Sequence, residues 1–226
     1  LIFAIAFSYF IFISKLINFV KNSELKFELL KDKWKFVISN YLMIMFGSAG
    51  TQIDKIIIMP LLGAAVLGNY SLGLQVLIIF NALSSISYKF MLPQDSTKSS
   101  THKIKKYLFL ITIGISILGF FSLPIIMAEI FPKYNEATSA IQILALEIVP
   151  TSLFVIFSSK LLSLEKSGIF MISNGAGLIT MILGVFTLGV NYQMAGLFFT
   201  LVLSTTINAT ILILYYKKLG YSFNEI

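Results

Sequence analysis

The sequence predicts an all-α integral membrane protein, and three observations lead to that fold class. Of the 226 residues, 57% are hydrophobic and only 12% are charged, whereas a soluble domain carries about 25% charged residues. The mean hydropathy is +0.90. Residues 107–128 and 167–190 contain no Asp, Glu, Lys, Arg or His, and each run exceeds the roughly 18 to 20 residues that cross a bilayer as a helix.

About seven transmembrane helices are predicted from the length and apolarity of the runs. In chain order they fall at roughly 1–20, 36–60, 67–92, 107–128, 138–162, 168–190 and 194–216. Helices fit better than barrel strands, because these runs are continuous and far exceed the roughly 10 residues of a barrel strand.

The lysines predict which ends of the helices face the cytoplasm. Basic residues gather after the first, third, fifth and seventh spans, whereas the connections GAAVLGN and NYQMAG carry none. Positive charge stays on the cytoplasmic side of a membrane, so a multi-pass protein of the plasma (inner) membrane with a cytoplasmic C-terminus is expected. Asp95 and Lys105 then fall in a cytoplasmic loop after the third span.

Several functional classes are disfavoured by composition. The net charge is +7, but all 17 basic residues are Lys, and phosphate or base recognition usually recruits Arg, so no nucleic-acid partner is expected. There is no Cys, and the single histidine, His102, has no companions for a metal site. No phosphate-binding glycine loop, HExxH or Gly-x-Ser-x-Gly motif is present, which favours a transporter without a cofactor over an enzyme.

Residues 23–35, SELKFELLKDKWK, form a predicted amphipathic segment. Phe27, Leu30 and Trp34 are spaced to give one apolar stripe beside a lysine-rich face. Such a helix would lie on the membrane surface; a solvated linker is the alternative. With either interpretation the segment marks a boundary between two helical bundles.

Polar side chains inside the predicted spans are the candidate functional residues, because polar groups in hydrocarbon face other helices or a wet cavity. The candidates for a substrate or ion pathway are Asn40, Gln52, Asp54, Lys55, Gln75, Asn81, Glu147 and Asn174. At 1.5 Å per residue, Asp54 and Lys55 lie roughly 8 to 9 Å, and Glu147 roughly 12 Å, below the outer surface.

These depths predict that the groups meet in one cavity in the outer half of the bundle. Asp54 and Lys55 point about 100° apart around their helix, so each needs a partner elsewhere, and Glu147 is the predicted partner of Lys55. Two alternatives stay open. In the first, the flexible side chains of the charged residues extend until their charged ends reach the lipid head groups. In the second, the charged residues form ion pairs that only fix the packing of helices.

The stretch from Trp34 to Ser96 resembles the start of the second half of polysaccharide exporters, the Wzx-like O-antigen flippases. These belong to the superfamily of multidrug, oligosaccharidyl-lipid and polysaccharide exporters. The matching patterns are DKIII at 54–58, LLG at 61–63, LG at 67–68, YSL at 70–72 and LP at 92–93. A second patch, IFPKY at 130–134 followed by Ala137, is similar to an outer loop of that family, which usually has Gly in place of Pro132.

The resemblance implies a division of the chain into parts of two bundles. Residues 1–20 correspond to the last helix of a truncated N-terminal bundle, 21–35 to the cytoplasmic linker, 36–218 to a six-helix C-terminal bundle and 219–226 to a cytoplasmic tail. The chain begins at Leu1 rather than Met, so we expect a preceding segment that holds the rest of the first bundle. That this fragment by itself is inactive stays open as a third possibility.

The activity implied by the resemblance is the movement of a polyprenyl-pyrophosphate-linked oligosaccharide across the membrane by alternating access. Lys55 would attract the anionic head group, and Asp54 would respond to a coupling proton or sodium ion. The expected partners are the lipid-linked oligosaccharide, membrane lipids and the missing bundle. Two rivals stay open: a cation-exporting multidrug transporter of the same superfamily, and a membrane enzyme such as a polysaccharide polymerase or acyltransferase.

Overall fold

The computed structural model describes residues 34, 37–38, 41–42, 45, 52–97, 101–132, 138 and 140–221. Apart from residues 34 and 37–38, all of these belong to the compact unit Ser39–Ile226. The predicted helix 1–20 and Asn40 lie outside the described residues, as do the linker 21–35 apart from Trp34 and the second half of the IFPKY patch.

Every regular element in the described part of the chain is helical, which confirms the predicted fold class. Residues 52–62 are helical and lead through Gly63 into the first long helix. The elements that follow are α3 (Ala64–Ser96), α4 (His102–Ile130), α6 (Gln142–Ser163), α7 (Gly168–Gly184), the short π-helix η1 (Val185–Gly189) and α8 (Val190–Lys218).

The chain is a helical membrane protein. Four helical stretches of the described residues are long and apolar enough to cross a membrane: Ala64–Ser96, His102–Ile130, Gln142–Ser163 and Gly168–Lys218. The last of these folds back on itself, because Gln193 has the non-helical angles φ 48° and ψ −124°. It therefore supplies two legs, α7 with η1 and then α8, which pack against each other. The predicted total of seven spans stays a prediction, because the first lies outside the described residues.

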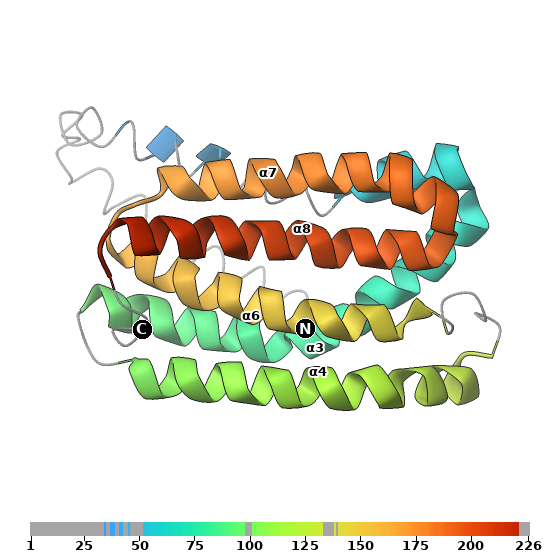
Figure 1. Ribbon diagram of the computed structural model, residues 1–226, viewed down its shortest axis with the longest axis horizontal. Helices are drawn as coiled ribbons and strands as arrows, with labels where there is room; N and C mark the ends of the chain where they lie inside the picture. The colour runs from blue at the N-terminus through green and yellow to red at the C-terminus, as the bar shows by residue number, and fades with distance from the viewer. Residues whose placement is uncertain are drawn as a thin grey trace, which may run out of the picture. The chain divides into compact units, whose positions relative to one another are not determined.

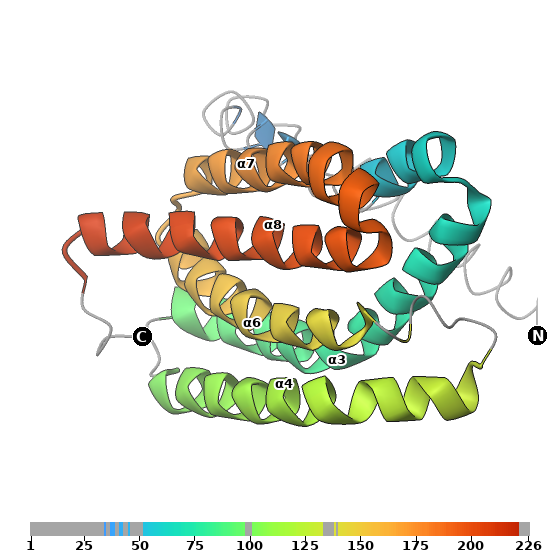
Figure 2. The same ribbon diagram turned by 45° about the vertical axis from the view of Figure 1, so that its right-hand side comes forward.

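Helix α6 is the central helix of the bundle. It packs against α3, α4 and α8, whereas α3 and α4 contact each other little although they are consecutive in the chain. In both views α7 and α8 lie side by side, and α6 lies between α8 and α4 (Figure 1, Figure 2). Helix α6 is therefore covered by other helices on three sides, and it has a high share of buried residues.

The core has two apolar clusters separated by a polar layer. One cluster includes Tyr70, Leu144 and Phe198, and the other includes Phe157 and Tyr216. Between them, hydroxyl and amide groups form hydrogen bonds from one helix to the next. These contacts are Asn81–Glu147 (2.9 Å), Ser116 to the Ala145 carbonyl (2.7 Å), Thr112–Ser152 (3.0 Å) and Ser204 to the Gly177 carbonyl (2.9 Å).

The helices alternate in direction, so their lysine-bearing ends gather on one side. The C-terminal ends of α3, α6 and α8 and the N-terminal ends of α4 and α7 meet there (Figure 1). Every described lysine except Lys55 lies in or next to these ends, and we call this side the lysine-rich end. The asymmetry matches the predicted charge distribution, and the assignment of this end to the cytoplasm stays a prediction.

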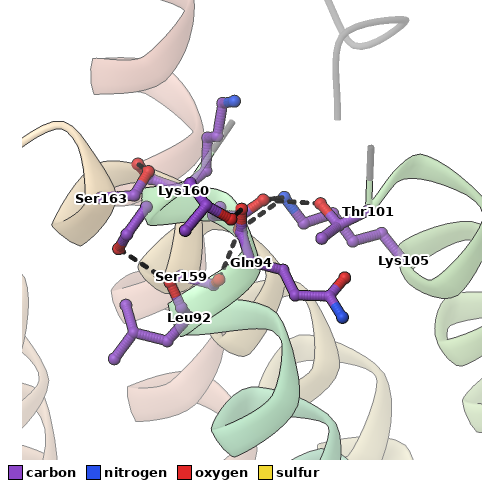
Figure 3. A network of polar contacts seen from close by, with 10 residues as sticks. Leu92, Gln94, Thr101, Lys105, Ser159, Lys160 and Ser163 are labelled. Atoms are coloured by element: carbon purple, nitrogen blue, oxygen red, sulfur yellow. Dashed lines mark hydrogen bonds and ion pairs between the residues drawn. The ribbon is translucent and has the colours of Figure 1, made fainter. Parts of the chain in front are cut away.

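A buried ion pair and the hydroxyl groups bonded to it join three helices at the lysine-rich end. The Lys105 ammonium lies 2.9 Å from both oxygens of the Asp95 carboxylate, and both side chains are almost fully buried. The same carboxylate accepts hydrogen bonds from the hydroxyls of Thr101 (2.6 Å) and Ser159. Figure 3 shows Lys105, Thr101 and Ser159 converging on this point. We call these four residues the Asp95 cluster.

The Asp95 cluster corrects the sequence-based placement of Asp95 and Lys105 in a loop. Helix α3 continues through Pro93 to Ser96, and α4 begins at His102. Both charged residues are therefore helical and buried. The physical reason is that the carboxylate accepts hydrogen bonds from three donor groups, two hydroxyls and the Lys105 ammonium, which compensates for its removal from water.

Replacing Asp95 with Ala should strongly destabilise the bundle, because the Lys105 ammonium would be left buried without its counter-charge. The expected cost is about 3–5 kcal/mol of unfolding free energy, measured by denaturant unfolding of the purified protein in detergent. The double change Asp95→Leu with Lys105→Met should recover much of the loss. Lys103→Ala, at an exposed lysine of the same end, is the control, and an Asp95→Ala protein as stable as that control would contradict the role of the cluster.

Candidate functional site

The helical segment 52–62 carries the charged pair singled out by the sequence, and it ends at a sharp turn. Gly63 has a φ of 91°, a left-handed conformation that residues with a Cβ rarely adopt. The turn leads directly into α3. Because α3 starts there, Tyr70 on its second turn faces back towards Asp54.

Asp54 is anchored inside the protein. Its carboxylate accepts a hydrogen bond of 2.6 Å from the Tyr70 hydroxyl and one of 2.7 Å from the backbone N–H of Lys55. Asp54 is only 3% exposed, and Tyr70 is fully buried against the Phe198 ring, with ring centroids 6.1 Å apart. The Asp54 carboxylate therefore fixes segment 52–62 onto α3.

Lys55 lies beside this anchor but has a different environment. Its side chain is half-buried, and its ammonium donates a hydrogen bond of 3.3 Å to the Gln52 side-chain oxygen. Lys55 lines a cavity of about 530 Å³, which we call the Lys55 cavity. The volume lies within the roughly 300–1,000 Å³ range of ligand pockets.

The wall of the Lys55 cavity is mixed polar and apolar. Its lining residues are Asp54, Lys55, Ser71, Leu74, Gln75, Leu77, Ile78, Asn81, Ser85 and Leu201. The residues from α3 recur every three or four positions, so they form one stripe along that helix. The hydroxyl and amide groups of this stripe, together with the Lys55 ammonium of segment 52–62, can form hydrogen bonds with a polar ligand.

Glu147 on α6 lies behind this wall. It is only 4% exposed, and its carboxylate accepts a hydrogen bond of 2.9 Å from the Asn81 amide and another from the Thr151 hydroxyl. These described partners are both neutral. The predicted pairing of Glu147 with Lys55 is thus replaced by contacts to Asn81 and Thr151, and Glu147 does not line the Lys55 cavity.

The structure brings together four of the eight predicted site residues. Asp54, Lys55, Gln75 and Asn81 line one cavity, and Asn81 connects it to Glu147. Gln52 is exposed and contacts the cavity through Lys55.

Asn174 lies apart from these four, in a second cavity at the lysine-rich side. Asn40 lies outside the described residues.

Some residues of the site gave no signal in the sequence. Tyr70 and Thr151 supply the hydroxyl donors for the two buried acids, but isolated Tyr and Thr residues are common in membrane helices and carry no distinctive spacing. For Thr151, the position four residues after Glu147 on one helix face could have indicated the contact. For Tyr70, only the turn at Gly63 brings the side chain back to Asp54.

Comparisons with protein-family models, with curated proteins and with solved structures return no match for this chain. The functional argument therefore rests on the site itself.

Replacing Tyr70 with Phe should destabilise the protein, because the buried Asp54 carboxylate would lose its side-chain donor. The expected cost is about 1–3 kcal/mol of unfolding free energy, measured by thermal or denaturant unfolding in detergent. Tyr107→Phe is a matched control, since Tyr107 is 63% exposed on the outer face of α4. Equal effects of the two changes would show that the Tyr70–Asp54 bond is not an anchor.

Proposed function

We propose that this chain is the C-terminal bundle of a flippase that exports a polyprenyl-pyrophosphate-linked oligosaccharide for assembly of surface polysaccharide. The observation that carries the proposal is the Lys55 cavity, in which an ammonium shares a wall with amide and hydroxyl side chains. An ionisable side chain within a membrane helix is costly and marks a functional site by default. The side chains that line the Lys55 cavity fit a ligand that is both anionic and rich in hydroxyl groups.

The two charged residues of segment 52–62 take different roles in this proposal. Asp54 is occupied by the Tyr70 hydroxyl and a backbone N–H, and it holds the segment in place. Lys55 faces the cavity and would attract the pyrophosphate, because attraction between opposite charges is strong where water is scarce. Gln75 and Asn81 on α3 would form hydrogen bonds with sugar hydroxyls.

The proposed activity is transport rather than catalysis, at the plasma membrane and with the lysine-rich end cytoplasmic. In this proposal the Lys55 cavity lies towards the outer leaflet, and the missing N-terminal bundle of the same protein would close its open side. The half-buried Lys55 ammonium also argues against the rival cation exporter, because a positive charge in the cavity wall repels a cationic drug. The Asp54 carboxylate in the same wall is occupied by the Tyr70 hydroxyl and a backbone N–H.

A coupling proton or sodium ion fits Glu147 better than Asp54. The Asp54 carboxylate serves as an anchor, whereas Glu147 is buried with two described neutral donors, Asn81 and Thr151. A cation bound at Glu147 would neutralise a charge in the middle of the bundle. Because Asn81 also lines the Lys55 cavity, a change in that hydrogen bond would alter the substrate site directly.

Lys55→Ala in the full-length protein should lower export of surface polysaccharide by about tenfold or more, since a lost charge-assisted hydrogen bond is worth about 1.5–3 kcal/mol. Polysaccharide is measured on cells that depend on this protein for export, together with the amount of protein in the membrane. Lys103→Ala removes the same charge outside the cavity and should have no effect. Normal export by the Lys55→Ala protein would remove Lys55 from the site.

Glu147→Gln should leave the fold intact but abolish the dependence of transport on the ion gradient. The new amide can accept a bond from Asn81 Nδ2 or Thr151, and its NH₂ group can donate to the Asn81 side-chain oxygen, which is buried and has no partner among the residues that the structure describes. Transport by full-length protein in vesicles is measured with and without a proton or sodium gradient. Glu129→Gln, at an exposed acid of α4, is the control. Gradient-driven transport that survives Glu147→Gln would rule out this ion site.

A further inference from the structure

A second cavity, of about 380 Å³, lies nearer the lysine-rich end than the Lys55 cavity. We call it the Lys89 cavity. Its lining residues come from α3, α6 and α7: Ser85, Tyr88, Lys89, Phe154, Val155, Ser158, Leu162, Phe170 and Asn174. Helix α6, which packs against α3, contributes Phe154, Val155, Ser158 and Leu162.

The lining of the Lys89 cavity is chemically divided. Phe154, Leu162 and Phe170 are among the residues that give it a largely apolar wall. Lys89 contributes the only formal charge among the described lining residues, and no carboxylate is among them. A ligand that fits both parts has an anionic group beside Lys89 and a hydrocarbon portion against the aromatic rings.

Ser158 gives an independent indication that a polar ligand group enters this cavity. The residue is only 3% exposed, and its hydroxyl has no hydrogen-bond partner within the described part of the protein. Serine hydroxyls in helices usually bond to a carbonyl of the preceding turn, as Ser163 and Ser152 do in the same helix. A buried polar group without a partner is costly, so a ligand oxygen at this place would remove that cost.

The Lys89 cavity continues the Lys55 cavity. The two share Ser85, and both are lined by the same stripe of α3, which runs from Ser71 through Gln75, Asn81 and Ser85 to Lys89. From Ser71 to Lys89 the helix rises by about 27 Å, close to the roughly 30 Å hydrocarbon thickness of a bilayer. Two ammonium groups, Lys55 and Lys89, thus lie beside opposite ends of this stripe.

We propose that the Lys89 cavity is a second binding site for the pyrophosphate and first isoprene units of the lipid-linked substrate, on the side of the lysine-rich end. This inference rests on the proposed flippase function. The pyrophosphate binds Lys89, Ser158 and Asn174, and the isoprene units lie on Phe154 and Phe170. The substrate then moves along the α3 stripe to Lys55. Two cationic sites reduce the distance over which the anion travels without a counter-charge in a medium of low dielectric.

The absence of Cys from the chain allows a direct test, because one introduced cysteine is a unique reporter. Leu162→Cys places a thiol in the half-buried wall of the Lys89 cavity. The Leu162→Cys change is made in the full-length protein, and any native cysteines outside the present chain are replaced by Ser. This protein is placed in phosphatidylcholine vesicles. Its rate of maleimide labelling is measured with polyprenyl pyrophosphate, polyprenol or phosphatidylglycerol. Polyprenyl pyrophosphate should slow labelling by about tenfold, which corresponds to about 1.4 kcal/mol, and the other two lipids should have little effect.

Matched variants assign the protection to Lys89. Adding Lys89→Ala should abolish the protection by polyprenyl pyrophosphate, whereas adding Lys103→Ala should leave it unchanged. If Lys89→Ala fails to fold, Lys89→Gln keeps most of the side chain and removes the charge. Protection that survives the loss of the Lys89 charge, or no protection in the parent Leu162→Cys protein, would overturn the proposal. Equal protection by phosphatidylglycerol would assign the cavity to an ordinary membrane lipid instead.

The outcomes separate this proposal from the proposed function. If Lys55→Ala stops export but Leu162→Cys is not protected, only the second site is wrong. If Lys55→Ala exports normally, Lys55 is not part of the substrate site. If cells that lack the whole protein also export normally, the flippase function itself is wrong, and protection at Leu162→Cys would then report a lipid site of another kind of membrane protein.

Discussion

The structure depends on the central position of α6 among three other helices. Hydrocarbon offers no hydrogen-bond partners, so polar groups of a membrane bundle must be satisfied by the protein. Helix α6 meets this constraint because α3, α4 and α8 all pack against it. Its Glu147 bonds to Asn81 of α3, its Ala145 carbonyl to Ser116 of α4, and its Ser159 to Asp95 at the end of α3. The position of every neighbouring helix is therefore fixed by at least one polar contact or by apolar packing on α6.

These contacts also hold in place the stripe of α3 that we propose as the substrate path. Because α3 is held against α6 at Asn81 and again at Asp95, its polar stripe keeps one orientation over most of its length. The Lys55 and Lys89 cavities lie along this stripe and share Ser85. The hydrogen bonds of the middle polar layer thus stabilise the bundle and also position the side chains of the proposed path. Asn81 belongs to both, since it lines a cavity and binds the buried Glu147.

Asp54 and Glu147, two buried acids away from the lysine-rich end, have different roles because their hydrogen-bond donors differ. Asp54 and Glu147 are similarly shielded from solvent. Asp54 accepts its bonds from the adjacent backbone N–H in segment 52–62 and from the hydroxyl of Tyr70, on the other side of the turn at Gly63. Glu147 accepts its bonds from two side chains, one of which belongs to a different helix and lines the Lys55 cavity. A change of charge at Glu147 is therefore coupled to the position of α3, whereas Asp54 only fastens segment 52–62.

The sequence by itself determined the helical membrane fold, the approximate bounds of α4, α6, α7 and α8, and the asymmetry of the lysines, because long apolar runs and charge placement are local properties. It also indicated Asp54, Lys55, Gln75 and Asn81, since polar residues in an apolar run are conspicuous. Only the tertiary structure decided that α3 and α4 pack mainly on α6 rather than on each other, and that Glu147 meets Asn81 rather than Lys55. Likewise it showed that Asp95 is buried with Lys105. The physical reason is that these partners lie on different helices or on different turns, and the order of helices around a bundle depends on packing that no local pattern records.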